Sequence, residues 1–286
     1  MDRRTGFHSG ELAVQRRAGV DRDAARLIGM LDAPDLRGGL ARSLAERTFL
    51  AITAHDRTGR LWITPLVGSP GFVEVRGPAD LLVHAVPPPG DPLEGLGAGQ
   101  QVGILALDPA RRRRVRVNGT LSGADERELA VHVDQAYGNC PRFIHPRDLE
   151  PAPVLGPPTV RRGQALAPAD VDLVRRADTF LLGTSHPTRG ADASHRGGRV
   201  VVEDARTLYW PDLPGNNMFN SLGNIAADPA AALVFVDFAT GGTVHLSGQA
   251  EIDWAEEGRG VRFTVEALVS GPTLALRERR EEHSTA

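Results

Sequence analysis

The stretch that decides the fold is Arg114-Val115-Arg116-Val117-Asn118-Gly119, because it is matched further along by Thr243-Val244-His245-Leu246-Ser247-Gly248. Thr48-Phe49-Leu50 returns in the same way as Thr179-Phe180-Leu181. Between these anchors, both halves of the chain contain short apolar strands and Gly-rich turns. A repeat this long indicates a duplicated domain, since solenoid units recur every 20–50 residues or so.

The hydrophobic pattern predicts a mainly β fold with peripheral helices. Short strands with regular turns between them favour a small antiparallel barrel in each copy. The proline-rich stretch 141–158 predicts a linker, so the domains are expected at residues 1–150 and 151–286. Helices are expected at 21–31, 126–137, 170–177 and 219–226, and residues 277–286 are expected to fray.

Composition narrows the class of protein. A 286-residue chain with 41% hydrophobic residues can bury two cores, and a net charge of −3 gives no general attraction to nucleic acid. No apolar run approaches the length of a membrane span, and no signal peptide is evident. The single cysteine, Cys140, excludes an internal disulfide and predicts a cytoplasmic protein. The nine histidines show no metal-ligand spacing, so no metal site is expected.

The chain contains no lysine, which excludes Schiff-base chemistry from that side chain. Any phosphate contact must therefore come from Arg, Asn, Ser, Thr or backbone N–H groups.

The second copy contains an Asn-rich turn before a short helix, with Asn216, Asn217, Asn220 and Ser221. The first N–H groups of a helix have no internal partner and favour an anion, so this turn predicts a phosphate site. The alternative is one ordinary N-cap followed by a solvated turn. The first copy has Pro87-Pro88-Pro89-Gly90 in the comparable stretch, which suggests that only one copy keeps a site.

Ser194-His195-Arg196-Gly197 is a second candidate segment. Its glycine allows close approach to a ligand, although an ordinary turn is equally consistent. A Ser–His hydrolase dyad is disfavoured, because neighbouring residues on a strand point to opposite faces and no G-x-S-x-G elbow occurs.

The Arg-rich strand of the first copy is a third candidate. Alternation puts Arg114 and Arg116 on one face, with Val115 and Val117 on the other. In isolation this pattern is typical of a solvated face. Cys140 follows this region, and a lone cysteine is more often inert packing than a redox group.

With these motifs in hand, the chain resembles the pyridoxamine 5′-phosphate oxidase-related, FMN-binding split-barrel family. The second copy is similar over Tyr209-Trp210-Pro211-Asp212, the Asn-rich helix and 227–235, and the first copy over 113–119. Phe7-His8-Ser9-Gly10-Glu11-Leu12 and 137–143 resemble a bacterial subfamily with two fused barrels.

The resemblance implies FMN held in a groove between two tandem barrels packed as a pseudo-dimer, in a monomer or a homodimer. Arg114 and Arg116 would then reach the flavin held by the second copy. The family's basic phosphate residues fall near Asn220 and Ser221 here, so Arg196 is expected to supply the charge. The family's substrate residues have no counterpart near the C-terminus, and pyridoxamine phosphate oxidation is not expected.

The resulting expectation is an FMN-dependent oxidoreductase that acts on a small-molecule substrate. NAD(P)H or a separate reductase would supply electrons, and no catalytic residue is nominated. The alternative is a non-catalytic carrier or sensor of flavin or haem, and some relatives bind haem or a deazaflavin.

Overall fold

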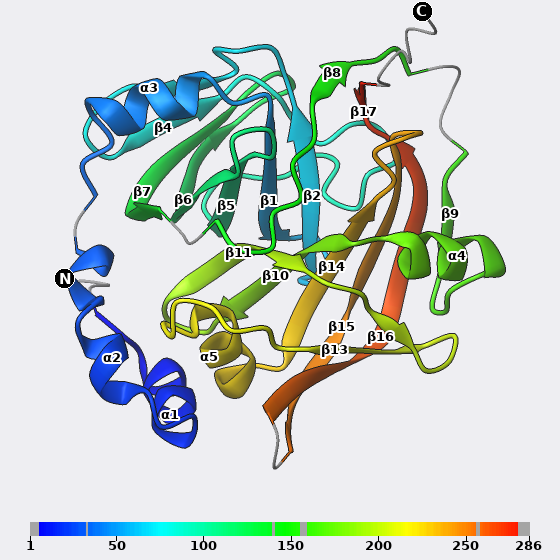
Figure 1. Ribbon diagram of the computed structural model, residues 1–286. Coiled ribbons are helices and arrows are strands. Elements are labelled where there is room, and N and C mark those ends of the chain that lie inside the picture. Colours follow the sequence, from blue (N-terminus) through cyan, green and yellow to red (C-terminus); the bar gives the residue numbers. More distant parts are fainter. Residues whose placement is uncertain (1–5, 33, 139–140, 155–158, 256–257, 280–286) are drawn as a thin grey trace, which may run out of the picture.

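The computed structural model describes residues 6–32, 34–138, 141–154, 159–255 and 258–279. The chain is mainly β, as predicted, with two large antiparallel sheets and short helices at their edges (Figure 1).

The first sheet has seven strands in the order β2-β1-β5-β6-β7-β4-β3. Their bounds are β1 Phe49–His55, β2 Leu61–Val67, β3 Val73–Val75, β4 Asp80–Val83, β5 Gln101–Asp108, β6 Arg113–Ala124 and β7 Leu129–Gly138.

The second sheet runs β11-β10-β14-β15-β16-β13-β12, with β9 (Arg161–Gly163) beside β16. Its strands are β10 Thr179–His186, β11 Gly190–Gly197, β12 Val201–Val202, β13 Thr207–Pro211, β14 Ala230–Val236, β15 Gly242–Ala255 and β16 Gly258–Thr273. This order repeats that of the first sheet strand for strand, so the sequence repeat corresponds to a repeat of topology. The exact division after residue 150 stays a prediction.

The two sheets pack through matching strands. β2 lies against β14 and β15, and its counterpart β11 lies against β5 and β6. A shared apolar cluster fills this contact, with Phe49 and Ile63 from the first sheet and Leu181 and Val234 from the second. The arrangement has the reciprocity of a symmetric dimer interface, and it creates two related grooves between the sheets.

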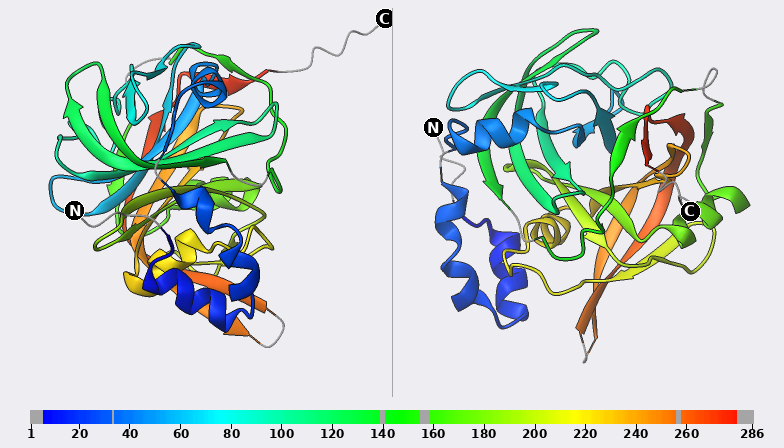
Figure 2. Two further views of the ribbon diagram at one scale, coloured as in Figure 1. Left: turned by 90° about the vertical axis from the view of Figure 1, so that its left-hand side faces the viewer. Right: turned by 45° about the horizontal axis from the view of Figure 1, so that its top comes forward.

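The helices cover the edges of the sheets. They are α1 Ser9–Arg17, α2 Asp21–Ala25, the 3₁₀ turn η1 Ile28–Leu31, α3 Gly39–Ala45, α4 Pro168–Arg176 and α5 Asn220–Ala227. The helix predicted at 21–31 is therefore broken in two. Although α1 precedes the first sheet in sequence, it packs on α5 of the second copy. In Figures 1 and 2 the blue N-terminal helices lie beside α5.

The helix predicted at 126–137 is wrong, because this segment forms β7. Leu129, Val131 and Val133 alternate into the core, and β7 pairs with both β4 and β6. The hydrogen bonding of β7 to strands on both sides, and the alternation of buried residues with a period of two, outweighed the local helix propensity.

Two other sequence predictions need correction. Within the predicted linker, β8 (Leu149–Pro151) pairs with β17 (Leu276–Glu278), which overlaps the start of the segment 277–286 that was expected to fray. The rest of that tail from residue 280, linker residues 155–158 and Cys140 lie outside the described residues.

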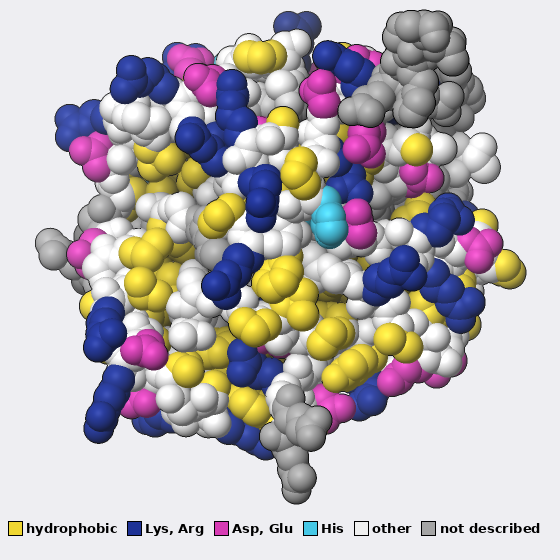
Figure 3. All heavy atoms as spheres, viewed as in Figure 1, with side chains coloured by type: hydrophobic (Ala, Val, Ile, Leu, Met, Phe, Trp, Pro, Cys, Tyr) yellow, Lys and Arg dark blue, Asp and Glu magenta, His cyan; other side chains and the backbone are white. Residues whose placement is uncertain are grey.

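The described helices are all too short or too polar to cross a membrane. No group of His, Cys, Asp and Glu side chains suited to a metal ion occurs in the described part of the chain. On the face in Figure 3, arginine side chains are interspersed with acidic and apolar ones and form no single basic patch.

Candidate functional site

Eight of the ten predicted site residues line one small cavity between the two sheets. The cavity has a volume of about 70 Å³. The eight are Arg114 and Arg116 from β6, His195 and Arg196 from β11, and Asn216, Asn217, Asn220 and Ser221 from the turn into α5. Ser194 lies behind this lining, with its Oγ 3.1 Å from Ser221 Oγ, and Gly197 is not part of the lining.

The cavity wall from the second copy is the start of α5. Its N-cap, Phe219, makes no capping hydrogen bond with its side chain, so the first helical N–H groups are left for another acceptor. Both Asn217 (φ 63°) and Phe219 (φ 59°) are left-handed. Such residues persist only where their surroundings hold them, and they cluster at functional sites.

The side chains of this turn differ in what they contact. Asn216 Oδ1 accepts a hydrogen bond from the Met218 backbone N–H at 3.1 Å, which closes the turn. Asn220 Nδ2 donates to Glu11 Oε1 at 2.6 Å. The Asn217 amide makes no hydrogen bond within the described residues, so it is the side chain best placed to meet a ligand.

The first copy contributes Arg114, whose Nη1 donates to the His195 carbonyl at 3.1 Å and lies 3.2 Å from His195 Nδ1. Thr179 Oγ1 lies 2.6 Å from His195 Nε2 and donates to the Arg196 carbonyl. Burial, and then the guanidinium groups of Arg114 and Arg196, lower the pKa of His195 to about 3. His195 is therefore neutral, and both of its ring nitrogens are engaged.

Arg116 forms a buried ion pair across the sheets. Its Nη1 lies 2.9 and 3.1 Å from the two carboxylate oxygens of Asp192 on β11. The same carboxylate accepts a hydrogen bond from Ser221 Oγ at 3.1 Å. The solvated face predicted for these arginines in isolation is thus wrong for Arg116, which is 7% exposed.

Arg196 is paired within the second copy. Its Nη1 donates to Asp212 Oδ1 at 3.1 Å, and Arg259 Nε donates to the other oxygen at 2.7 Å. Arg259 also stacks over the Phe219 ring, 4.4 Å from its centroid. Arg196 therefore shares its charge with the Asp212 carboxylate, and its expected role as the main charge against a phosphate stays a prediction.

The polar groups around the cavity suit a phosphate monoester. Among the described residues at this site, four arginines (114, 116, 196 and 259) face two aspartates (192 and 212) and Glu11, whose pKa burial raises to about 7, so positive charge remains in excess. A dianion at an uncapped helix start would balance it. The volume is far below the 300–1,000 Å³ or so of small-molecule sites, so the cavity as it stands fits a phosphate group and not a flavin ring.

Several residues of the site were not singled out from the sequence. Asp212 ends the Tyr209-to-Asp212 motif and Asp192 lies two residues before Ser194, but only the fold shows that they pair with arginines. Glu11 stood in the Phe7-to-Leu12 segment, and no local pattern connected it to Asn220, 209 residues away.

The repeat-related position in the other half of the molecule lies where β15 contacts β2, and its polar side chains pair with protein groups there. At the repeat positions of Arg114 and Arg116 stand Thr243 and His245, and His245 is fully buried with its Nδ1 donating to the Ile63 carbonyl at 3.1 Å. Buried Asp91, from the proline-rich loop, fills the space beside it and accepts hydrogen bonds from Thr64 Oγ1 and the Leu93 backbone N–H, both at 2.8 Å.

No family model matches this sequence, and no curated protein matches it. Among solved structures, a putative pyridoxamine 5′-phosphate oxidase from Lactobacillus delbrueckii is 18% identical over 37% of this chain and 94% of its own, with a TM-score of 0.32. A FAD-binding protein from Mesorhizobium loti is 14% identical over 40% of this chain and 99% of its own, with a TM-score of 0.29.

A FAD-binding protein from Mycobacterium smegmatis is 16% identical over 39% of this chain and 97% of its own, with a TM-score of 0.28. Likenesses at these identities and TM-scores do not assign a ligand or an activity to this chain.

Proposed function

We propose that the chain is a flavin-binding protein that holds the phosphate of FMN in the cavity between its two sheets, and that it acts as an oxidoreductase on a small molecule. The observation that carries the proposal is the convergence of Arg114 and Arg116 from one copy with the uncapped start of α5 from the other. A bound flavin would supply electron transfer.

In this proposal the protein's own residues bind and orient the cofactor. The α5 N–H groups and the Asn217 amide donate to the phosphate, and Arg114 adds a charge-assisted contact. His195 stays neutral because of its low pKa and keeps Arg114 in place through its carbonyl and Nδ1. Since the cavity is too small for the ring, the flavin ring is expected to lie outside it when FMN binds.

The first experiment compares ligands on the purified chain. FMN should bind more tightly than riboflavin, and Arg114→Ala should weaken FMN roughly 10- to 100-fold while leaving riboflavin nearly unchanged, because only FMN offers the anion. Asn217→Ala should have a smaller effect of the same kind. Equal binding of FMN and riboflavin by the wild type would contradict the phosphate site.

Spectra and reduction separate the enzyme from the alternatives. A flavin gives absorption near ~450 nm, whereas haem gives a Soret band. Anaerobic reduction of the yellow protein by NADH, NADPH or an added reductase would support an oxidoreductase. Yellow protein that none of these can bleach would favour a carrier, and a Soret band would overturn the flavin assignment.

A further inference from the structure

We propose that the N-terminal helix α1 is part of the cofactor site, with Glu11 and Gln15 as positioning residues that fix the phosphate-binding turn and the start of α5. This inference rests on the proposed function for its ligand. The sequence patterns predicted no role for either residue. Both residues precede the first sheet, whereas the turn belongs to the second copy.

The polar face of α1 is buried against α5. His8, Glu11 and Gln15 are spaced by three and four residues, which puts them on one face of the helix and its cap. Glu11 is 3% exposed and Gln15 1% exposed. Long polar side chains are rarely buried this deeply without specific partners, so each of the three is expected to have one.

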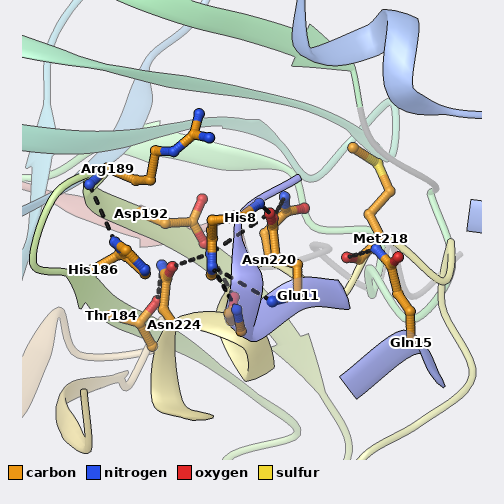
Figure 4. Close-up of polar contacts among 12 residues, drawn as sticks. His8, Glu11, Gln15, Thr184, His186, Arg189, Asp192, Met218, Asn220 and Asn224 are labelled. Atoms are coloured by element: carbon orange, nitrogen blue, oxygen red, sulfur yellow. Dashed lines mark hydrogen bonds and ion pairs between the residues drawn. The ribbon is translucent and has the colours of Figure 1, made fainter. Parts of the chain in front are cut away.

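Each of the three contacts a different point of α5 or its entry turn (Figure 4). Gln15 Nε2 donates to the Met218 carbonyl at 3.0 Å. Glu11 Oε1 accepts from Asn220 Nδ2 at 2.6 Å, and His8 Nε2 lies 3.0 Å from Asn224 Oδ1. Together they hold the turn and the first two turns of α5 in one orientation.

These contacts fall where the backbone most needs support. Met218 lies between Asn217 and Phe219, the two left-handed residues of the turn. Its carbonyl is bound by Gln15, and its side chain is fully buried with Leu31 and Tyr137, next to Phe7 and Leu27 of the N-terminal segment. Residues 7–31 therefore hold the turn through both its backbone and its side chain.

The two helices also approach too closely for any ordinary side chain at their crossing. A Cβ added to Gly223 would lie 2.5 Å from Glu11 Cγ and 2.6 Å from the Glu11 backbone N. A rigid contact of this kind fixes the direction of the α5 axis, and with it the direction of the N–H groups at its start. Donors held in this way bind an anion without having to be ordered first.

Glu11→Ala and Gln15→Ala test the assignment, with two readouts. FMN affinity should fall roughly tenfold in each, the effect of losing one hydrogen bond that holds a donor. Amide hydrogen exchange of residues 216–223, measured without any ligand, should become faster. Glu11→Gln should restore part of both readouts, because its single amide oxygen can accept from Asn220 but no longer also from the His8 backbone N–H, which Glu11 Oε2 accepts at 2.8 Å.

Two control variants separate positioning from general destabilisation. Arg16→Ala alters an exposed neighbour on α1 and should change neither readout. Leu36→Ala, in the core of the first sheet, should lower the stability of the protein without weakening FMN.

The outcomes distinguish the inference from the function on which it rests. The wild type could bind no FMN while residues 216–223 still exchange faster in the two variants than in the wild type. That result would refute the proposed function and leave α1 as the support of the turn. Unchanged affinity and unchanged exchange in both variants, in a chain that binds FMN, would overturn the inference. An affinity loss of equal size in Leu36→Ala would overturn it as well.

Discussion

Arg116 carries a positive charge that is almost removed from solvent, with Asp192 as its counter-ion on the other sheet. Strand alternation predicted which face Arg116 shares with Arg114, and the structure agrees. The depth of its burial depends on the approach of β11, which no local pattern encodes. At the scale of residues, therefore, the sequence indicates the donors of the site, and the fold supplies their carboxylate partners.

We expect Arg116→Ala to destabilise the protein by about 3–5 kcal/mol, because it leaves the buried Asp192 carboxylate without its partner. Urea unfolding monitored by tryptophan fluorescence measures this change. Arg113→Ala, at an exposed position on the same strand, should stay within about 0.5 kcal/mol of wild type. Equal effects of the two substitutions would show that the ion pair contributes nothing to stability.

His195 predicts a dependence of stability on pH. Its pKa is about 3 in the folded protein and near 6.5 when unfolded, so between these values the unfolded chain binds the extra proton. The contribution of His195 to the free energy of unfolding is then fully present above about pH 6.5 and is lost as the pH drops towards 3.

His195→Gln should remove about 2 kcal/mol of the difference in unfolding free energy between pH 7 and pH 4.5. Two other buried groups also contribute to the slope: His8, with a pKa lowered to about 4, acts in the same direction as His195, and Glu11, with a pKa raised to about 7, acts in the opposite direction. A variant with the full wild-type slope would rule out His195 as a source of acid sensitivity.

Among the elements, α5 and most strands of both copies were predictable, because their apolar periodicity and turn residues agree with the fold, whereas β11 and β16 were not predicted as strands. The segment 126–137 was not, since its strand conformation depends on pairing with β4 and β6. The docking of α1 on α5 could not be predicted from periodicity either. Polar residues face the contact, and glycines at the crossing leave no apolar stripe to recognise.

The glycine crossing gives a prediction at this scale. Gly223→Ala should destabilise the protein by about 1–3 kcal/mol, because its methyl group meets the backbone of α1. Gly39→Ala, at the exposed start of α3 with no atom near its added Cβ, should be neutral or slightly stabilising. Thermal unfolding of the two variants side by side decides the matter, and equal melting temperatures would contradict the close contact.

At the scale of the whole molecule, the duplication was evident from two short repeats, and the identical strand order of the two sheets agrees with it. The inequality of the two grooves was only suggested by the sequence. The loop that begins at Pro87-Pro88-Pro89-Gly90 brings Asp91 beside His245, where both are buried. This burial depends on tertiary packing and could not be predicted from the sequence.

We therefore expect one FMN per chain. Isothermal titration and the ratio of flavin to protein absorbance should both give a stoichiometry near one, because the second groove lacks arginines at the repeat positions and is filled by the loop. Asn217→Ala should lower the affinity of this one site without exposing a second. A stoichiometry of two would mean that the loop opens to admit a ligand.

The fusion of the two copies has a consequence for how the site responds to dilution. In a homodimer, a groove between subunits disappears when the protein concentration falls below the dissociation constant, and ligand affinity then varies with the amount of protein. Here β6 and α5 are tethered by one chain, so their encounter is intramolecular and mass action cannot separate them. The same tether lets mutations accumulate in one groove and spare the other, a freedom that identical subunits do not have.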